Sequence, residues 1–273
     1  MKIIFPVNKD NSIKYYDVHY RYLLNILSIV NIPLTLVEIP PTGENTFEIR
    51  INDELILIDF SDHLTIEKNL EKYRLCFKYH YTISDHSKYT NIVPFSPVSF
   101  HDWNLYNLGR KNIHYTCNND IILNNQRPGG AAIERRTTVQ RMLRDRYGNR
   151  IDTRFCKKQD DFFHLINNCL VSVCVPGARN NMLDRGQFQY MALGCCTISP
   201  YLDEVLAGGV PLKPQLHYIV CRPDYSDLIE RIEWCKLHRD RCISIGRNAA
   251  NLFAKTSTPN AIWSWILSKI STR

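Results

Sequence analysis

The sequence predicts an α/β protein of two lobes with a cleft between them. Strand-like and helix-like segments alternate along most of the 273 residues, and the strands of the second half are continuous apolar runs. Such runs are typical of a parallel sheet that is covered by helices on both faces. The pattern loosens into polar residues at 107–119, which places a boundary there. We expect lobes at 1–115 and 116–255, followed by a C-terminal segment at 256–273.

The first half is richer in strand than in helix. An apolar strand is followed by an amphipathic run with helical spacing and then by five β-prone runs. Asn52 and Asp53 join two of these runs, which we interpret as a hairpin or as adjacent strands. The expected elements are strands at 2–7, 32–39, 46–51, 54–60, 74–83 and 90–100 and a helix at 16–30.

The second half alternates more regularly, which predicts a Rossmann-like lobe. At 183–200 a helix passes through Gly194 into a short strand. The other expected elements are strands at 120–125, 151–156, 169–177 and 216–223 and helices at 132–148, 159–168, 226–238, 239–255 and 260–270. Ligands of open parallel sheets bind beyond the carboxyl ends of the strands, so the loops that follow these ends are the candidate functional loops.

One such loop, QRPGGAAIERR at 126–136, follows the strand at 120–125. Paired glycines allow a close approach of the backbone to a ligand, and the helix behind them presents its positive end. The loop fits neither a Walker A motif nor GxGxxG. Its candidate diphosphate-binding residues are Arg127, Gly129, Gly130, Arg135 and Arg136. The alternative is an ordinary glycine turn with solvated arginines.

A second loop and helix follow the strand at 169–177. Arg185, near the start of the helix, would add a fixed charge and forked donors to an anion site. Gln189, one turn further on, could bind hydroxyl groups of a ribose or base. The alternative is a surface helix that ends with a C-cap at Gly194. The candidate nucleotide-binding residues here are Pro176, Gly177, Asn181, Asp184, Arg185 and Gln189.

A third loop, DFSDH at 59–63, carries carboxylates at a strand end. Asp59 or Asp62 could act as a general base toward a hydroxyl group. The alternative is a turn in which Asp62 caps the following segment.

Composition and charge restrict the class of protein, its location and its partners. The balance of 44% hydrophobic and 22% charged residues is that of a globular protein, and no stretch reaches the roughly 18 apolar residues of a membrane span. The initial apolar run is too short for a signal peptide, so we expect a cytoplasmic protein.

The ten cysteines contain no CxxC, which favours buried thiols over a metal site. The net charge of +7 and the arginine-rich stretch at 127–158 suit a polyanionic partner.

Two segments of the second half resemble a known class of enzymes. GQFQYMALGCCTIS at 186–199 is similar to the donor-lobe segment of GT-B glycosyltransferases, with Gln189 where those enzymes usually carry the glutamate that holds the ribose. The segment 212–254, with its HY strand, SDL, tryptophan-bearing helix and NAANLFA, resembles the CAP10-like O-glucosyl/O-xylosyltransferases and more distantly the exostosin-like ones. The resemblance covers about Asp120 to Ala254 and fades in the first half.

The resemblance implies a GT-B fold and a sugar transfer. A UDP-sugar, with xylose or glucose favoured, would be the donor, and a glycan or monosaccharide, possibly on a glycoprotein, would be the acceptor. Asn181 and Gln189 stand where retaining members often carry two glutamates, which favours an inverting mechanism with Asp59 or Asp62 as base. The chain has no Asp-x-Asp, so neither a metal nor a cofactor is expected. The helix at 260–270 would cross back onto the first lobe.

Two other classes remain as alternatives. A dinucleotide-dependent oxidoreductase would share the Rossmann-like architecture, but the sequence lacks GxGxxG and an acidic residue at the end of a second strand. A non-catalytic nucleic-acid-binding protein would use the arginine-rich stretch, in which stacking aromatic residues are scarce. We therefore expect no nucleic-acid partner.

Overall fold

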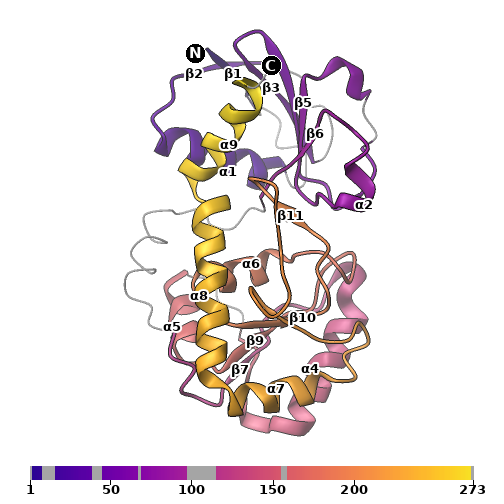
Figure 1. Ribbon diagram of the computed structural model, residues 1–273, viewed down its shortest axis with the longest axis vertical. Coiled ribbons are helices and arrows are strands. Elements are labelled where there is room, and N and C mark those ends of the chain that lie inside the picture. The colour runs from indigo at the N-terminus through magenta and orange to yellow at the C-terminus, as the bar shows by residue number, and fades with distance from the viewer. Residues whose placement is uncertain are drawn as a thin grey trace. The chain divides into compact units, whose positions relative to one another are not determined.

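Two compact units make up the chain (Figure 1). The computed structural model describes residues 2–7, 16–38, 45–66, 69–96, 115–154 and 159–271. Unit 1 comprises residues 1–101, 204–211 and 255–273, and unit 2 comprises residues 102–203 and 212–254. The polar segment in which the sequence places the lobe boundary lies outside the described residues, apart from 115–119.

Unit 1 is built on a six-stranded sheet in the order β2-β1-β3-β4-β5-β6. β3 is antiparallel to both of its neighbours, while β1 pairs parallel with β2, β4 with β5 and β5 with β6. All strands except β3 therefore end at one common carboxyl edge. The strands are β1 (Ile3–Pro6), β2 (Leu34–Val37), β3 (Thr46–Ile51), β4 (Glu54–Asp59), β5 (Leu75–Lys78) and β6 (Ile92–Pro94). β3 and β4 form the predicted hairpin, with Asn52 in its turn at φ 52°.

A row of aromatic rings packs across this sheet. Phe47 lies 5.7 Å from Phe5 and 5.7 Å from Phe60, and Phe60 lies 5.7 Å from Phe95, measured between ring centroids. Offset and edge-on pairs at this spacing add to the stability that burial of the rings provides. The rings thereby connect β1, β3 and the residues that directly follow β4 and β6.

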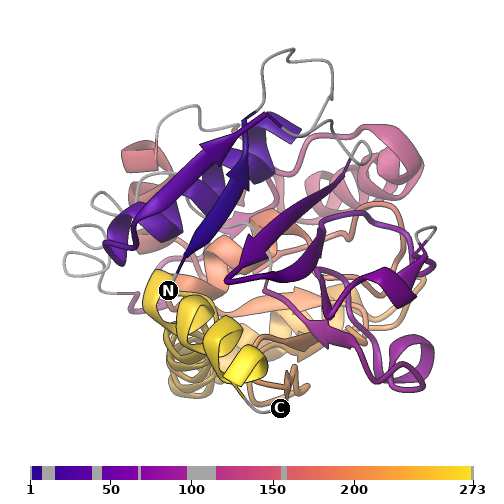
Figure 2. The same ribbon diagram turned by 90° about the horizontal axis from the view of Figure 1, so that it is seen from above.

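Unit 1 also contains segments from the second half of the chain. α9 (Pro259–Ser271) packs against α1 (Tyr16–Ile29), as Figures 1 and 2 show. The sequence assigns 204–211 to the second lobe, whereas the structure places this hairpin, β11 (Val205–Leu206) and β12 (Val210–Pro211), in unit 1. Buried Ser96 explains the attachment, because its hydroxyl accepts from Ala207 N at 3.1 Å and donates to Thr256 O at 2.8 Å. Unit 1 also contains the short helix α2 (Ile83–His86) and the 3-10 turn η1 (Leu70–Lys72).

Unit 2 is built on a five-stranded, fully parallel sheet. Its order is β13-β10-β9-β7-β8, so the strands taken in chain order stand as 2-1-3-4-5 across the sheet. This is the order of a doubly wound sheet whose topological switch point lies between its first and third strands, β7 and β9. The strands are β7 (Ile122–Leu123), β8 (Ile151–Asp152), β9 (Val171–Val173), β10 (Thr197–Ser199) and β13 (Ile219–Val220).

Helices cover both faces of this sheet. Ile122, Val171 and Ile198 pack in one cluster with apolar residues of α4 (Ile133–Tyr147), α7 (Leu228–Leu237) and α8 (Arg239–Thr256). Thr197 points to the other face, where Gln187 of α6 (Arg185–Ala192) donates to its hydroxyl at 3.4 Å. The remaining elements are α5 (Gln159–Asn167) and the 3-10 turns η2 (Gly130–Ala132) and η3 (Gly148–Arg150). The alternation that the sequence predicts for this half is thus present.

Cysteines contribute to these apolar cores. All nine that the structure describes are buried and free of disulfide bonds, and Cys156 lies outside the described residues. Burial raises the pKa of the Cys221 thiol to about 12, so this group is an uncharged packing group at neutral pH. Within the described part of the chain, no helix has the length and apolar character needed to cross a bilayer.

Candidate functional site

A pocket of about 270 Å³ opens in unit 2 at the switch point of the parallel sheet. The loop that follows β7 and the first turns of α6 surround it. Because the chain leaves β7 and β9 toward opposite faces of the sheet, the two loops separate there and leave a crevice. The residues that line it are Asn125, Gln126, Arg127, Arg136, Phe162, Asp184, Arg185, Gly186, Gln189 and Tyr190. Three arginines face one aspartate in this lining, which favours an anionic ligand.

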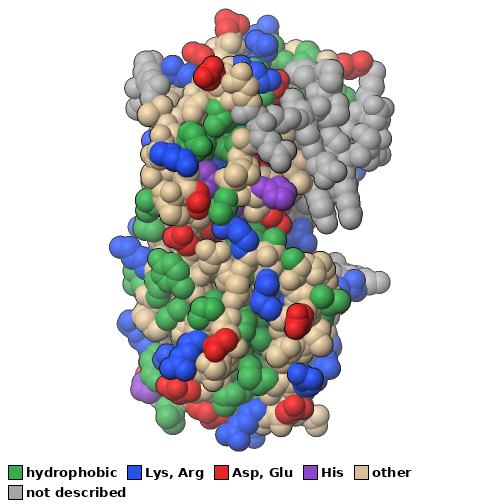
Figure 3. Space-filling model, turned by 90° about the vertical axis from the view of Figure 1, so that its right-hand side faces the viewer, with side chains coloured by type: hydrophobic (Ala, Val, Ile, Leu, Met, Phe, Trp, Pro, Cys, Tyr) green, Lys and Arg blue, Asp and Glu red, His purple; other side chains and the backbone are tan. Residues whose placement is uncertain are grey.

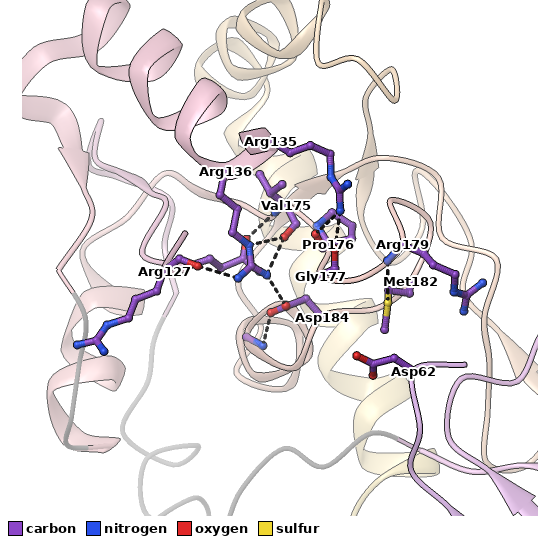
Figure 4. Close-up of polar contacts among 12 residues, drawn as sticks. Asp62, Arg127, Arg135, Arg136, Val175, Pro176, Gly177, Arg179, Met182 and Asp184 are labelled. Atoms are coloured by element: carbon purple, nitrogen blue, oxygen red, sulfur yellow. Dashed lines mark hydrogen bonds and ion pairs between the residues drawn. The ribbon is translucent and has the colours of Figure 1, made fainter. Parts of the chain in front are cut away.

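Arg136 connects the two loops at the edge of the pocket (Figure 4). Its guanidinium group donates to Val175 O at 3.1 Å, to Arg127 O at 2.9 Å and to the Asp184 carboxylate at 2.8 Å. Arg135 points away toward the loop after β9 and donates to Gly177 O at 2.5 Å. Both guanidinium groups therefore hold the loops that form the site, and Arg136 also lines the pocket.

Asp184 is the N-cap of α6. One carboxylate oxygen accepts from Gly186 N at 2.8 Å, and the other accepts from Arg136. A carboxylate in this position satisfies a free N–H group and the positive end of the helix dipole. The sequence names Asp184 as a nucleotide-binding residue; it lines the pocket, and because both of its oxygens are engaged by the protein, the structure adds the role of a cap, while its contact with a nucleotide stays a prediction.

The N-terminus of α4 differs from that of α6. It begins after η2 with Ala132 as N-cap, and no side chain caps it or the preceding turn at Gly129. A Cβ atom at Gly129 or Gly130 would meet nothing within 4 Å, and Gly130 has φ +53°. Space therefore remains at the start of a 15-residue helix, where the N–H groups of Ala132 and Ile133 bond to the carbonyls of Gly129 and Gly130. The positive end of a helix of this length favours an anion.

Amide and aromatic groups complete the wall of the pocket. Gln126 is 8% exposed; its Oε1 accepts from Val175 N at 2.5 Å, while its Nε2 has no partner among the described residues. Phe162 stacks on Tyr190 with ring centroids 4.9 Å apart, and the Tyr190 hydroxyl bonds to Asn125. A buried amide donor without a partner is costly unless a ligand or water satisfies it. The wall thus offers a donor and an apolar surface beside the arginines.

In unit 1, Asp59 is buried in an ion pair. Its carboxylate lies 3.3 Å from Lys78 Nζ and accepts from Ser61 N at 2.7 Å. Lys78, fully buried, also donates to Ser61 O at 2.8 Å. Burial lowers the pKa of Lys78, and the Asp59 charge opposes that shift. Asp59 is enclosed and paired, so it anchors the loop that carries Asp62 and fits the predicted role of a base less well than Asp62 does.

Asp62 lies beside a buried histidine. Its side chain is 55% exposed, and its Oδ1 lies 3.3 Å from His80 Nε2. His80 is 1% exposed, and its Nδ1 lies 2.5 Å from Glu204 Oε1. Burial disfavours the imidazolium form, but the charges of Glu204 and Asp62 outweigh burial and raise the pKa of His80 above its ordinary value. The three side chains form a row that leads from a buried carboxylate to an exposed one.

Two observations bear on metal ligands and on the distribution of basic side chains. No group of three or more His, Cys, Asp or Glu side chains within those residues is arranged to hold a metal ion. On the face drawn in Figure 3, the described Lys and Arg side chains are interspersed with acidic and apolar ones and form no continuous basic stripe. Within the arginine-rich stretch, Arg135 and Arg136 donate to backbone carbonyls of the loop after β9.

Comparisons with solved structures show which fold the chain has. The chain resembles a glycosyltransferase from Rickettsia africae ESF-5 with a TM-score of 0.52 and 12% identity, over 98% of this chain and 85% of that one. It also resembles Anabaena Alr3699/HepE, solved in complex with UDP and glucose, with a TM-score of 0.51 and 12% identity, over 92% of this chain and 75% of that one. The chain has the α/β fold of GT-B glycosyltransferases, with two Rossmann-like lobes.

Sequence relatives are short matches. No model of a known protein family matches the chain. Uncharacterized protein 035R of Invertebrate iridescent virus 3 is 45% identical over 42 residues, which is 15% of this chain and 4% of that protein. Uncharacterized protein 179R of Invertebrate iridescent virus 6 is 33% identical over 70 residues, or 23% of this chain and 6% of that protein. The chain thus matches only a small part of the length of either relative.

The structure brings together some of the residues that the sequence singles out. Arg127, Arg136, Asp184, Arg185 and Gln189 line the pocket of unit 2. The others do not line it: Gly129, Gly130, Arg135, Pro176, Gly177 and Asn181. Pro176 and Gly177 instead provide the carbonyls that hold Arg135.

Sequence reasoning missed several residues of both units. Gln126 and Phe162 carry no motif that would identify them. Arg179 follows β9, and its Nε and Nη2 atoms are enclosed without a hydrogen-bond partner among the described residues; an arginine in that loop was a detectable signal. His80 and Glu204 lie 124 positions apart, so their pairing left no local pattern.

Proposed function

We propose that this chain is a glycosyltransferase that moves a sugar from a UDP-sugar to a hydroxyl group of a glycan or monosaccharide. The observation that carries the proposal is the pocket at the switch point of unit 2, where Arg127, Arg136 and Arg185 line one cavity in a fold of the GT-B type. A nucleoside diphosphate needs fixed positive charge and N–H donors at its phosphates. The three arginines of the pocket offer the charge, and the buried Nε2 of Gln126 offers an N–H donor in the same lining.

The leaving group is the centre of the proposed chemistry in unit 2. As the bond between the anomeric carbon and the phosphate oxygen breaks, negative charge grows on the departing UDP. Arg185 is exposed, lines the pocket and makes no side-chain hydrogen bond or ion pair with the described residues, so it is available to the phosphates. Arg179, with two enclosed donors, is a second candidate. Cations that are in place before the reaction stabilise such charge without reorganisation.

The acceptor half of the reaction is assigned to unit 1. We infer that Asp62 takes the proton of the acceptor hydroxyl while the oxygen forms the new bond to the anomeric carbon. Asp62 fits this role because its carboxylate is exposed and lies at the carboxyl edge of the sheet, after β4. The transfer is proposed to invert the anomeric configuration and to need no metal or cofactor. Glucose or xylose is the proposed sugar, because the sequence resembles enzymes that transfer them.

A panel of nucleotides tests the proposal. Melting temperature is measured with UDP, UDP-glucose, UDP-xylose, GDP, CMP and NADH, and calorimetry measures the Kd of each compound that stabilises the protein. We expect the uridine compounds to raise the melting temperature most, because a ligand that binds only the folded state stabilises it by mass action. Stabilisation by NADH alone would support an oxidoreductase, and no stabilisation by any nucleotide would refute the transferase.

A further inference from the structure

Three segments meet at the carboxyl edge of the sheet in unit 1 and bring Asp62, His80 and Glu204 together. Asp62 follows β4 and His80 follows β5, and these strands are parallel neighbours. Loops that follow neighbouring parallel strands emerge at the same edge. Glu204 arrives from far along the chain and is fixed there, because the next residue, Val205, donates its N–H to Tyr81 O at 3.0 Å. The row is therefore built by the fold and not by a local motif.

We propose that Glu204 and His80 act as positioning residues that orient the Asp62 carboxylate and keep it ionised, so that it is ready to accept the proton of the acceptor hydroxyl. This inference deepens the proposed glycosyl transfer and rests on it. Glu204 Oε1 lies 2.5 Å from His80 Nδ1, which fixes the ring and leaves Nε2 toward Asp62 at 3.3 Å. A carboxylate behind a histidine fixes the tautomer and orientation of its ring in the same way at metal and catalytic sites.

The surroundings of His80 supply the charges that this role requires. Facing His80 are the carboxylates of Asp62 and Glu204, and the ring of Tyr79 packs at 4.1 Å between centroids. Lys78, the nearby cation, is held by Asp59 and Ser61 and also interacts electrostatically with Asp62. Two carboxylates about one imidazole favour its protonated form. His80 then donates through both nitrogens, one to each carboxylate.

The arrangement of Asp62, His80 and Glu204 favours a role in proton transfer in addition to packing. A buried pair of charges costs desolvation energy and is weak support for stability, so a buried Glu–His pair directed at an exposed carboxylate calls for another role. Asp62, 55% exposed and oriented by His80, takes the acceptor proton. The hydroxyl oxygen forms its bond to the anomeric carbon, the bond to the UDP oxygen breaks with its electron pair, and the proton leaves Asp62 to solvent afterwards.

Two measurements test this inference, and the first of them does not depend on the transfer itself. The first is an NMR titration of the His80 ring in the full chain, in the wild type and in the Asp62→Asn and Glu204→Gln variants. We expect each substitution to lower the His80 midpoint by about one pH unit, since each removes one adjacent charge. The matched control is His86→Gln, which removes a buried histidine of the same region that bonds to Leu64 O and Thr82 N rather than to a carboxylate. It should leave the His80 midpoint in place.

The second measurement is the release of UDP from UDP-glucose, with methyl glucoside as the acceptor probe, followed as a function of pH. We expect His80→Gln to move the acid limb of kcat to higher pH by about one unit, because Asp62 loses its adjacent cation. The KM for UDP-glucose should change less than about twofold, since the donor is assigned to unit 2.

The outcomes are distinct. A His80 midpoint that responds to neither substitution overturns the inference, and so does an unchanged acid limb in His80→Gln. If the wild type binds and turns over no UDP-sugar, the proposed transferase fails, while the titration still decides whether the three side chains act as one row. Because Glu204→Gln keeps the size of the side chain, it preserves a test if His80→Gln does not fold.

Discussion

Gly246 of α8 lies directly against the backbone carbonyl of Gly194. A Cβ atom at position 246 would stand 1.8 Å from Gly194 O, which is far inside contact distance. Gly194 has φ +83° and turns the end of α6 into β10. Gly194 therefore permits the turn, and Gly246 permits α8 to pack closely on that turn.

Gly246→Ala should destabilise unit 2. The added methyl group must push α8 away from the turn, and overpacking of this kind costs about 1–3 kcal/mol or more. Chemical denaturation followed by circular dichroism measures the loss. Gly129→Ala is the control, because its Cβ would meet nothing within 4 Å. Equal stability of the two variants would contradict the contact.

Arg185→Ala should weaken UDP binding by about tenfold, the value of one charge-assisted hydrogen bond. Calorimetry with UDP measures the Kd. Arg141→Ala is the matched control: Arg141 is an exposed arginine of α4 that does not line the pocket, so its loss removes the same charge without touching the site. A similar loss of affinity in both variants would mean that only the overall charge of unit 2 matters.

Substitution of the two aspartates of unit 1 should have different consequences. Asp62→Asn should abolish sugar transfer and leave UDP affinity within about twofold, because it removes a base and no donor contact. Asp59→Asn should lower the free energy of unfolding by about 3–5 kcal/mol, since it leaves the charge of buried Lys78 without its partner. A double variant that also carries Lys78→Met should recover part of that stability. Loss of UDP binding in Asp62→Asn would contradict its assignment.

Chelation should leave the reaction unchanged. If arginines and the start of α4 neutralise the departing UDP, treatment with EDTA should alter neither the Kd for UDP nor the rate of UDP release. Calorimetry and initial rates with and without EDTA measure both quantities. Activity that disappears with EDTA and returns with added Mg²⁺ or Mn²⁺ would refute the metal-independent part of the proposal.

The stability that His80 provides should depend on pH. Its folded pKa is raised above the ordinary 6.5, so its contribution is complete below about pH 6.5 and disappears as the pH rises through the folded value. The difference in melting temperature between the wild type and His80→Gln should therefore be largest near pH 6 and shrink at higher pH. Burial lowers the pKa of His86 and His217, which gives the opposite trend, but those groups are common to both proteins and cancel. A difference that grows with pH would contradict the sign.

Elements with a local signal could be predicted from the sequence. The amphipathic run of α1, the apolar run of β9 and the turn residues Asn52 and Asp53 of the β3–β4 hairpin all show in the sequence, and each element is present. The pocket could be predicted in part for the same reason. Arg127 follows the predicted strand at 120–125, and Arg185 lies near the start of the predicted helix that ends at Gly194. The rule that ligands bind at the carboxyl ends of parallel strands then brings them to one edge.

Features that depend on distant pairing could not be predicted. No local pattern in the sequence marks Glu204, and only the fold places it against His80. The ion pair between Asp184 and Arg136 joins residues 48 positions apart, so the sequence did not reveal that Asp184 also has a structural role. Asp59 and Lys78 are cross-strand neighbours only because β4 and β5 pair in that register.

The path of the chain sets the order in which the units can be completed during synthesis. Residues 1–101 of unit 1 are made first, yet the hairpin at 204–211 and the segment from Lys255 onward are made only after most of unit 2. Within this chain, synthesis of unit 1 therefore starts before that of unit 2 and is completed after it. A nascent chain that stops between residues 102 and 203 carries Asp62 and His80 but no Glu204, so its acid–base group remains incomplete even where its central sheet has formed.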